Sequence, residues 1–431
     1  MQSEIVIVGG GAGGLELACK LGRKLGPGKV ALVDSRLYHI WKPSLHEVAA
    51  GTLDIHQEGL SYQMLAHDNG FAFIYGPMTG LDTAARKVIV GAVAGGGEEV
   101  LPERHLGYGS LVLAVGSTSN YFGVPGAAEY TISLNATEDA ERFRLRLLRL
   151  LARADEHKEE SGDGGINIVI IGGGATGVEL SAELREASGA YAVYGFSHLQ
   201  GRRDVHITLL EGAPRILAPL PERVSNAALR LLDKRSIKVV TDCRVTQIDA
   251  DKVHDKKGNV YPADLCVWAA GIRAPEFLGS LGLPTGHGGG LDVDDRLRVK
   301  GVPDVYALGD CAACVDGNGK PVPPRAQAAH QQADYLCDTL VRRAEGKPAP
   351  DKPYKYRDYG SLVSIGHGTT VGSLMGALRG ASWFVEGFVA RLMYVSLHLM
   401  HHQAVLGPIR TGVLAVARFL VRRATPLVKL H

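Results

Sequence analysis

The sequence predicts an α/β fold in which two successive βαβ units are followed by amphipathic helices at the C-terminal end. An apolar strand near the start of the chain runs into a glycine-rich turn and a helix, and the same arrangement returns near the middle. After residue 379, apolar and basic side chains alternate at helical spacing. A chain of 431 residues is long enough for two or three domains of this kind.

The first unit is a β-branched strand at 4–8, a glycine-rich turn at 9–14, a helix to residue 25 and a strand at 30–33 that ends in Asp34. The first glycine of the turn permits a tight bend, the third residue lets backbone amides approach a pyrophosphate, and the last glycine allows close packing of the helix. Asp34 stands where the ribose hydroxyls of a dinucleotide are held. The turn residues predicted to bind are Gly9, Gly11, Ala12, Gly13 and Gly14.

The second unit repeats this pattern with a strand at 166–171, a turn at 172–177 and a strand at 205–210 that ends in Glu211. Two such units in one chain imply two dinucleotides. The acid at the end of the second strand favours the free 2′-hydroxyl of NADH, although the nearby Arg215 leaves NADPH open. The turn residues predicted to bind are Gly172, Gly174, Thr176 and Gly177.

Two later apolar strands also end in glycine turns. The strand at 265–270 is followed by Gly271, and the strand at 305–308 is followed by Gly309 and Asp310. In open α/β sheets, ligands bind at this edge. The stretch at 155–165 is charged and rich in glycine, which indicates an exposed connection, so we expect the second unit to be an inserted domain.

The charge and the cysteines restrict the classes of protein. The formal net charge of +2 gives no reason to expect a nucleic-acid partner. Six cysteines in mostly apolar stretches fit reduced thiols, which indicates the reducing side of a membrane. Cys311 and Cys314 form a C-x-x-C pair, the pattern of a redox dithiol or of half a metal site. Because no second pair completes a zinc site, we favour packed thiols and assign no metal ligands, although a soft ion such as Cu(I) stays open for this pair.

The C-terminal region predicts contact with a membrane surface. Its apolar residues recur at helical spacing in two segments separated by Gly407 and Pro408, and neither segment is apolar enough to span a bilayer. The alternative is an amphipathic helix pair that packs on the core or on a second subunit, so a homodimer stays open. The first segment carries Trp383, Phe384, Phe388, Leu392, Val395 and Leu399. The basic residues are Arg379, Arg391, Arg410, Arg418, Arg422, Arg423 and Lys429, against one acid, Glu386.

Several blocks of sequence resemble known families. The blocks VLAVGS (112–117), VWAAGI (267–272) and VYALGDCA (305–312) resemble the connecting signatures of the two-dinucleotide-binding flavoproteins. Within that family, the chain resembles the single-subunit respiratory type II NADH dehydrogenases of bacteria, and the likeness runs over nearly the whole chain. The blocks that carry it are HIWKPSLHEVAAGTLD (39–54), GGGATGVELSAEL (172–184), PPRAQAAHQQA (323–333) and GSLVSIG (360–366).

This resemblance implies a glutathione-reductase-like fold with FAD in the first unit and NADH in the second. The implied activity is hydride transfer from NADH to FAD and then reduction of a membrane quinone, without proton pumping, at the cytoplasmic side of the cell inner membrane. The expected division is a discontinuous FAD-binding domain, a connecting segment, an NADH-binding domain and a membrane-association region. Their ranges are 1–117 with 285–378, then 118–164, 165–284 and 379–431.

The resemblance also assigns residues around the cofactors. It implies that Asp34 binds the FAD ribose, that Lys42 lies near the flavin, and that Asp310 bonds the ribityl chain. Further implied contacts are Gly116 and Ala328 to FAD, and Glu211, Ala270 and Gly271 to NADH.

The same resemblance places Glu179 against the nicotinamide, and it places Gln327 and Gln331 where the flavin meets the quinone. Glu179 follows the second glycine turn closely, so we expect it on the first turn of a helix, where the helix dipole favours a carboxylate. His330 has the side chain closest in pKa to proton delivery, although a buried structural histidine fits as well.

Two other functions fit parts of the pattern. One is a soluble NADH-dependent flavoprotein reductase whose basic tail binds an acidic acceptor protein. The other is a flavin-bearing NADH sensor without turnover.

Overall fold

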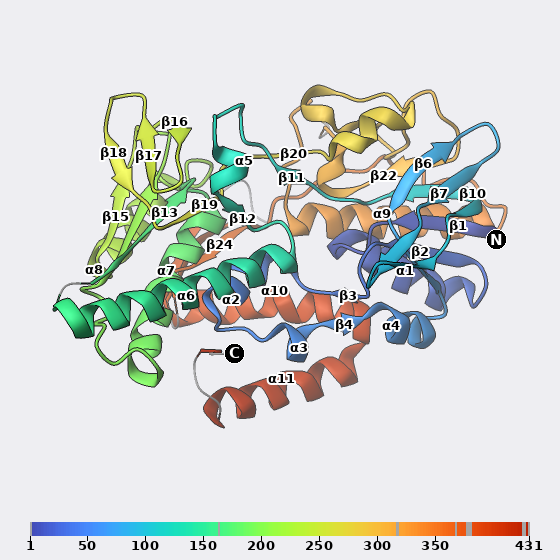
Figure 1. The fold of residues 1–431 in the computed structure, drawn as a ribbon. Coiled ribbons are helices and arrows are strands. Elements are labelled where there is room, and N and C mark those ends of the chain that lie inside the picture. Colours follow the sequence, from blue (N-terminus) through green and yellow to red (C-terminus); the bar gives the residue numbers. More distant parts are fainter. Residues whose placement is uncertain are drawn as a thin grey trace.

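The computed structural model describes residues 2–162, 164–315, 319–366, 369–375, 382–424 and 428–429. Two α/β sheets stand side by side, the first on the right and the second on the left in Figure 1. A three-stranded sheet and two C-terminal helices complete the described part of the chain. The expected α/β fold with two βαβ units is confirmed.

The first sheet has seven strands in the order β5-β2-β1-β10-β7-β6, with β22 beside β10. Its central strands are parallel and apolar on both faces because helices or connections cover both sides. β22 comes after the strands of the second sheet in the sequence, yet it pairs with β10 in the first sheet. The strands are β1 (Gln2–Val8), β2 (Val30–Asp34), β5 (Ala72–Tyr75), β6 (Met78–Asp82), β7 (Lys87–Val90), β10 (Arg104–Leu113) and β22 (Val305–Ala307).

The second sheet has five parallel strands in the order β12-β19-β13-β14-β15. β13 and β14 have the bounds that the sequence predicted. A short antiparallel sheet of β16 (Val245–Ile248), β17 (Lys252–Asp255) and β18 (Val260–Pro262) follows β15 in the chain. The five strands are β12 (Ile132–Ser133), β19 (Leu265–Trp268), β13 (Ile166–Ile171), β14 (Val205–Leu210) and β15 (Ile237–Val240).

Equivalent helices connect the first two strands of each unit. α1 (Ala12–Leu25) follows β1, and α7 (Ala175–Tyr194) follows β13. α9 (Ala326–Ala344) packs along α1. The connection before the second unit is largely α6 (Thr137–Ser161), whose buried face packs on α2 (Leu45–Ala50). The remaining long helices of the two units are α4 (Tyr62–Asn69) and α8 (Glu222–Lys234).

The third sheet is an antiparallel meander of β24 (Gly360–Ser364), β25 (Thr370–Met375) and β26 (Ser382–Glu386). Trp383 and Phe384 were expected to continue the apolar face of a helix, and that expectation is wrong because both lie in β26. Gly387, with φ +80°, separates the strand from the helix that follows. The buried valines of β24 and β25, Val363 and Val371, belong to the core of the second unit.

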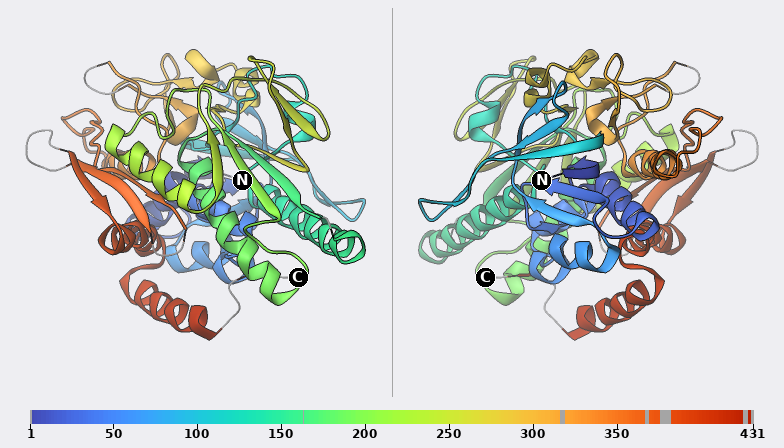
Figure 2. Two further views of the ribbon diagram at one scale, coloured as in Figure 1. Left: turned by 90° about the vertical axis from the view of Figure 1, so that its left-hand side faces the viewer. Right: turned by 90° about the vertical axis from the view of Figure 1, so that its right-hand side faces the viewer.

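Two helices, α10 (Phe388–Leu406) and α11 (Pro408–Ala424), end the fold. α10 packs on α1 and on the third sheet, whereas α11 lies outside the body of the molecule in both views of Figure 2. No helix in the described ranges has the length and apolar character needed to cross a bilayer.

The positive patch expected on this region is largely neutralised in its described part. Arg410 pairs with Asp68, Arg418 with Glu58, and Lys429 with Asp54 at 3.0 Å. These partners come from α4 and the segment before it, which are distant from the tail in the sequence. The basic side chains therefore fasten the tail to the body. Arg379 and the side chains of Arg422 and Arg423 lie outside the described residues.

Candidate active site

The first glycine turn has the shape of a pyrophosphate site. Gly9 has φ +102°, and a Cβ there would collide with the carbonyl oxygen of Ala114. A Cβ on Gly14 would collide with the oxygen of Gly9, so α1 approaches β1 as only glycine permits. A Cβ on Gly11, in contrast, would have nothing within 4 Å. Open space at the N-terminus of α1 is where a dinucleotide phosphate binds.

The second turn repeats this geometry. Gly172 has φ +113°, and a Cβ there would lie 2.7 Å from the backbone of Ala269. A Cβ on Gly177 would collide with the oxygen of Gly172, while Gly174 again faces open space. Gly174 and Thr176 are exposed at the start of α7. The tight bend and the close packing of the helix are thus present in both units, and binding of a pyrophosphate stays a prediction.

The two predicted ribose acids are anchored in the same way. Asp34 Oδ2 accepts a hydrogen bond from the backbone N–H of Gly10 at 2.6 Å. Glu211 Oε2 accepts from the N–H of Gly173 at 2.6 Å, and its Oε1 accepts from Ala213 at 2.7 Å. Burial raises the pKa of Asp34. Each carboxylate is held at the mouth of its glycine turn, where ribose hydroxyls arrive.

Arg215 does not lie free beside Glu211. Its guanidinium donates to the carbonyl oxygens of Leu220 at 2.8 Å and Ala218 at 2.5 Å, within its own loop. A 2′-phosphate would have to compete with these bonds. The geometry therefore favours NADH over NADPH more strongly than the sequence did.

The residues assigned to the flavin meet at the carboxyl ends of β10 and β22. Ser117 Oγ donates to Asp310 Oδ2 at 2.8 Å, and Lys42 Nζ donates to the carbonyl oxygen of Ser117 at 3.4 Å. Burial lowers the pKa of Lys42, although nearby Asp310 opposes the shift. Gly116 has φ +71° and open space around it. These side chains come from three distant segments, and the fold brings them together as expected.

The start of α9 closes this edge of the first sheet. The Gln332 amide oxygen accepts from the N–H of Gly309 at 2.7 Å and so fixes the turn that carries Asp310. Ala328 is in the first turn of α9 and is buried. Sequence reasoning assigned no role to Gln332, because a single glutamine in a helix carries no signal of what its amide will meet.

Gln327 and Gln331 both bond to the backbone of the segment that enters β24. Gln327 Nε2 donates to Gly360 O at 3.1 Å. Gln331 exchanges two hydrogen bonds with the backbone of Arg357, at 2.8 and 2.9 Å. The two amides fasten this segment to α9, and their contact with a quinone stays a prediction.

Glu179 is buried in a polar cluster and is not on the first turn of its helix. It is the fifth residue of α7, so the helix dipole is not what controls it. Its Oε1 accepts from the N–H of Ser364 at 3.1 Å, and its Oε2 lies 3.7 Å from His46 Nδ1. Tyr394 of α10 also bonds to it. Burial raises the pKa of Glu179, more than His46 lowers it.

His330 points toward α1. Its Nδ1 lies 2.5 Å from Glu16 Oε2, and this hydrogen bond is the main reason that the pKa of His330 is raised. Its side chain keeps 34% exposure. Sequence reasoning missed Glu16, although its offset from the first glycine turn equals that of Glu179 from the second.

The residues assigned to the nicotinamide side lie beside the second glycine turn. Gly271 has φ +68°, and a Cβ there would collide with the ring of Phe122. Its carbonyl oxygen accepts from Asn120 N at 3.2 Å. The indole of Trp268 donates to the oxygen of Ala270 at 2.6 Å and fixes this turn. Ala270 and Gly271 therefore border the mouth of the second unit.

All six cysteines are buried, and none of them forms a disulfide. Cys311 Sγ donates to the carbonyl oxygens of Leu308 and Leu113, and burial raises the pKa of its thiol to about 11. A thiol with this pKa is protonated at neutral pH and is a poor dithiol nucleophile. Within the described ranges, no three histidine, cysteine or acidic side chains are arranged to hold a metal.

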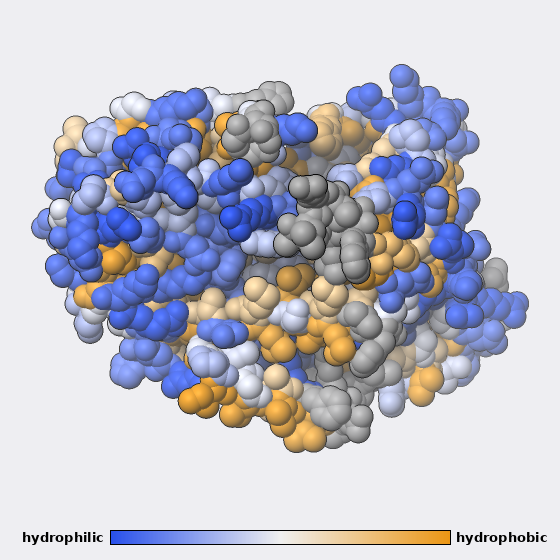
Figure 3. Space-filling model, turned by 180° about the vertical axis from the view of Figure 1, so that it is seen from behind, coloured by the Kyte–Doolittle hydropathy of each residue, from blue (hydrophilic) through white to orange (hydrophobic). Residues whose placement is uncertain are grey.

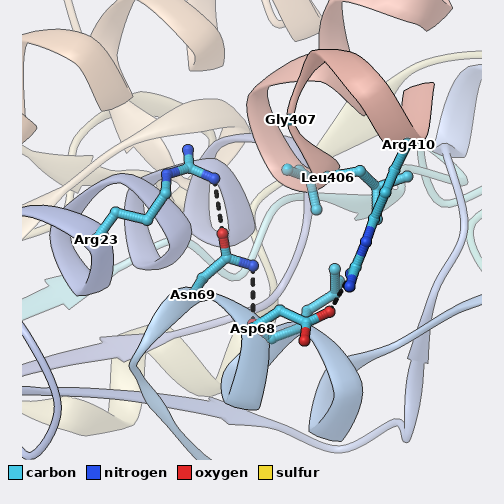
Figure 4. A pocket seen from close by; sticks show the side chains of 8 residues that line it. Arg23, Asp68, Asn69, Leu406, Gly407 and Arg410 are labelled. Carbon is cyan, nitrogen blue, oxygen red and sulfur yellow. Dashed lines mark hydrogen bonds and ion pairs between the residues drawn. The ribbon is translucent and has the colours of Figure 1, made fainter. Parts of the chain in front are cut away.

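A pocket of about 230 Å³ lies where α1 and α4 meet the joint between α10 and α11 (Figure 4). Arg23 donates to Asn69 Oδ1 at 2.6 Å on one wall, and Arg410 pairs with Asp68 on the other. Arg23 is at the C-terminal end of α1, away from the glycine turn. The pocket therefore belongs to the attachment of the tail, not to the dinucleotide sites.

Gly174 and Gly177 differ in the space around them, and substitutions can test this difference. A Gly174→Ala variant is expected to fold and keep its flavin, because the new methyl group meets no protein atom. It should weaken NADH binding by about tenfold, ~1.4 kcal/mol, by blocking backbone approach to the pyrophosphate. Titration of flavin bleaching with NADH measures this. Gly177→Ala is the contrasting variant and should lower the melting temperature, because its methyl group would collide with Gly172.

Comparisons with known proteins agree with this geometry. Residues 3–333 match the model of the pyridine nucleotide-disulphide oxidoreductase family. The type II NADH:quinone oxidoreductase of Haemophilus influenzae is 38% identical over all of both chains. That of Mycobacterium tuberculosis is 28% identical over 93% of this chain and 84% of its own. NDH2 of Plasmodium falciparum, solved with NADH, has the same fold, with a TM-score of 0.82 and 18% identity over all of both chains. The chain belongs to the pyridine nucleotide-disulphide oxidoreductase family.

Proposed function

We propose that the chain is a type II NADH:quinone oxidoreductase that takes electrons from NADH through FAD to a membrane quinone without pumping protons. The observation that carries this proposal is that each of the two units has a glycine turn with an acid bonded to it, Asp34 in the first and Glu211 in the second. The chain is also 38% identical to such an enzyme along its whole length. Two dinucleotide sites within one fold are what hydride transfer between cofactors requires.

FAD binds the first unit. The open space at Gly11, the anchored Asp34 and the cluster of Lys42, Ser117 and Asp310 lie at the carboxyl-terminal edge of the first sheet. This donor and acceptor set fits a pyrophosphate, a ribose and a polyhydroxy chain. FAD supplies the chemistry of accepting a hydride and passing on the electrons. The protein residues position it and exclude water.

NADH binds the second unit, with its pyrophosphate at Gly174 and its ribose at Glu211. Glu179 lies about one helical turn into α7 from this mouth, and it is more protonated than an exposed glutamate because burial raises its pKa. Quinone reduction consumes two protons, and a protonated carboxyl group can release one. His46 and Tyr394 hold the side chain of Glu179 in place for that role.

The C-terminal helices contact the membrane through apolar side chains. Ile409, Val413, Val416 and Leu420 recur at three or four residues along α11 and are 82%, 65%, 61% and 60% exposed. Apolar side chains gather along the lower edge of the molecule in Figure 3. A soluble protein rarely leaves such a ridge in water, whereas an interfacial helix buries it in lipid. This ridge supports a peripheral membrane protein, and we place the enzyme on the cytoplasmic face because its cysteines fit the reducing side of a membrane.

An anaerobic experiment tests the electron path. The purified yellow protein is mixed with NADH, its flavin absorbance is followed, and a short-chain quinone is then added. Bleaching followed by full recovery is the expected result. Bleaching without recovery would point to a protein acceptor, and no bleaching would refute NADH as the donor.

A further inference from the structure

Two carboxylates occupy equivalent positions in the two glycine-motif helices. Glu16 in α1 and Glu179 in α7 each stand two residues after the last glycine of their turn. Both are buried, with 1% and 7% exposure. Nothing in the dinucleotide chemistry of the first unit uses Glu16, and a charged side chain is rarely buried without a partner. Its partners therefore indicate what it does.

Both carboxylates are bound by the same C-terminal helix. His401 Nδ1 lies 2.8 Å from Glu16 Oε1, and Tyr394 bonds to Glu179. These two residues are seven positions apart on α10, so they project from one face. The same face carries Ala390 and Val405, both fully buried. Figure 1 shows α10 running beneath both units, from the second on the left to α1 on the right.

The hydrogen bonds around Glu16 fix where protons lie. His39 Nδ1 is 2.9 Å from the carbonyl oxygen of Gly10, which can only accept, so this nitrogen carries a hydrogen. Burial lowers the pKa of His39 strongly, so its ring is neutral and its Nε2 is an acceptor. His401 Nε2, 2.9 Å away, must then donate. His401 Nδ1 faces the Glu16 carboxylate, so His401 links Glu16 of α1 to His39.

This series of hydrogen bonds reaches the loop that carries Lys42. The ring of His401 packs against that of Trp41, with centroids 4.3 Å apart, and Lys42 follows Trp41 directly in the chain. His39 in β3 (Tyr38–His39) fixes the same loop to Gly10 in the first glycine turn. One side chain, Glu16, thereby connects α10, the glycine turn and the Lys42 loop.

We propose that α10 clamps the two dinucleotide-binding units in a fixed relation, and that Glu16 is the positioning residue of this clamp. The inference rests on the proposed function, because alignment of nicotinamide with flavin is what the clamp serves. Small displacements of reacting groups are costly, and a misplacement of about 1 Å can reduce a rate by a hundredfold. The membrane-facing tail is thus also a part of the hydride-transfer machinery.

Charged and titratable groups from three helices and β3 face Glu16. Lys20 of α1 lies 3.2 Å from its carboxylate, and His330 of α9 and His401 of α10 bond to it. Asp334 of α9 pairs in turn with Lys20 and His330, and His39 bonds to His401. Although burial opposes it, the hydrogen bonds from His330 and His401 hold the pKa of Glu16 well below its ordinary 4.5. Glu16 therefore stabilises the fold above pH 4.5 and loses this effect as the pH falls through its lowered pKa.

The contribution of His330 to stability depends on pH in the opposite direction. Its pKa is raised above 6.5, chiefly by the bond to Glu16, so its contribution is complete below pH 6.5 and is lost as the pH rises through the raised value. The charged group around Glu16 is therefore most stable between these limits and is weakened toward alkaline pH, when His330 loses its charge.

Glu16→Gln tests the clamp in the FAD-loaded protein, because it keeps the shape and removes the charge. Two readouts are needed: hydrogen exchange of the amides in 394–405, and the anaerobic rate of flavin bleaching by saturating NADH. We expect exchange to rise at least about tenfold and bleaching to slow about tenfold, with the NADH concentration for half-saturation unchanged. The alkaline decline of the wild-type rate should move to lower pH.

His401→Asn and His402→Gln form the matched comparison. The asparagine side chain retains a donor for Glu16 but loses the bond to His39, so His401→Asn should reproduce the Glu16→Gln effects in part. His402 is also buried on α10, and burial lowers its pKa to about 4, so it is neutral and His402→Gln should leave both readouts unchanged.

Unchanged exchange and an unchanged pH profile in Glu16→Gln would overturn the clamp. Equal effects in His402→Gln would also overturn the clamp, because they would show that any substitution of a buried residue on α10 disturbs the packing. If Glu16→Gln does not fold, His401→Asn decides by the same two readouts. Failure of the proposed function is distinguishable, because then wild-type flavin does not bleach with NADH, while exchange still reports on the clamp.

Discussion

Glu211→Arg is expected to lower the preference for NADH over NADPH by about a hundredfold or more. In the proposed NADH site the wild-type carboxylate would accept hydrogen bonds from ribose hydroxyls, and two bonds to a charged acceptor contribute on the order of 3 kcal/mol. An arginine removes these acceptors and gives the 2′-phosphate a cation to bind. Arg215 adds little in the wild type because its guanidinium is held by its own loop. The ratio of kcat/KM for the two coenzymes measures the change.

Glu211 also supports the glycine turn through Gly173, so a control must separate the two roles. Glu211→Gln keeps an acceptor for that N–H and cannot attract a phosphate. It should weaken NADH binding without improving NADPH. If Glu211→Arg leaves the ratio unchanged, the second unit does not hold the ribose at this position.

Replacing the ridge residues Ile409, Val413, Val416 and Leu420 by serine is expected to release the protein from membranes. Each of these side chains loses roughly 1 kcal/mol of burial in lipid, so the set contributes on the order of 4 kcal/mol, about a thousandfold in partitioning. Sedimentation with liposomes measures it. Activity from NADH to a soluble dye should persist, because the ridge faces away from the body of the protein.

Point substitutions are the sharper test, since a truncation before β26 would also remove a strand and the His401 contact. Leu414→Ser with Val421→Ser is the matched control, because these residues lie beside the ridge and are only 40% and 41% exposed. Salt should release the wild type poorly, because Arg410, Arg418 and Lys429 are already paired within the protein. Continued liposome binding by the fourfold variant would place the membrane contact elsewhere.

The sequence alone predicted both glycine turns and the acidic residue that ends the second strand of each unit. The strands at 166–171 and 205–210 have the predicted bounds, and the conformations of Gly9 and Gly172 are those expected. These features are local: a buried strand, a residue with positive φ and a helix start are each determined by neighbours along the chain. The cluster of Lys42 and Asp310 followed from family resemblance, not from pattern.

The tertiary structure alone decided what the charged side chains meet. The sequence placed Arg410 and Arg418 in a basic amphipathic tail without indicating protein partners, but Asp68 and Glu58, distant in the chain, pair with them. The same pattern predicted a helix where β26 lies, although pairing with β25 makes this segment a strand. The sequence indicated no role for Glu16, and its contact with His401 exists only in the packed fold, where α10 lies against α1. Electrostatic partners and sheet edges depend on contacts between remote segments, and only the packed fold determines which segments those are.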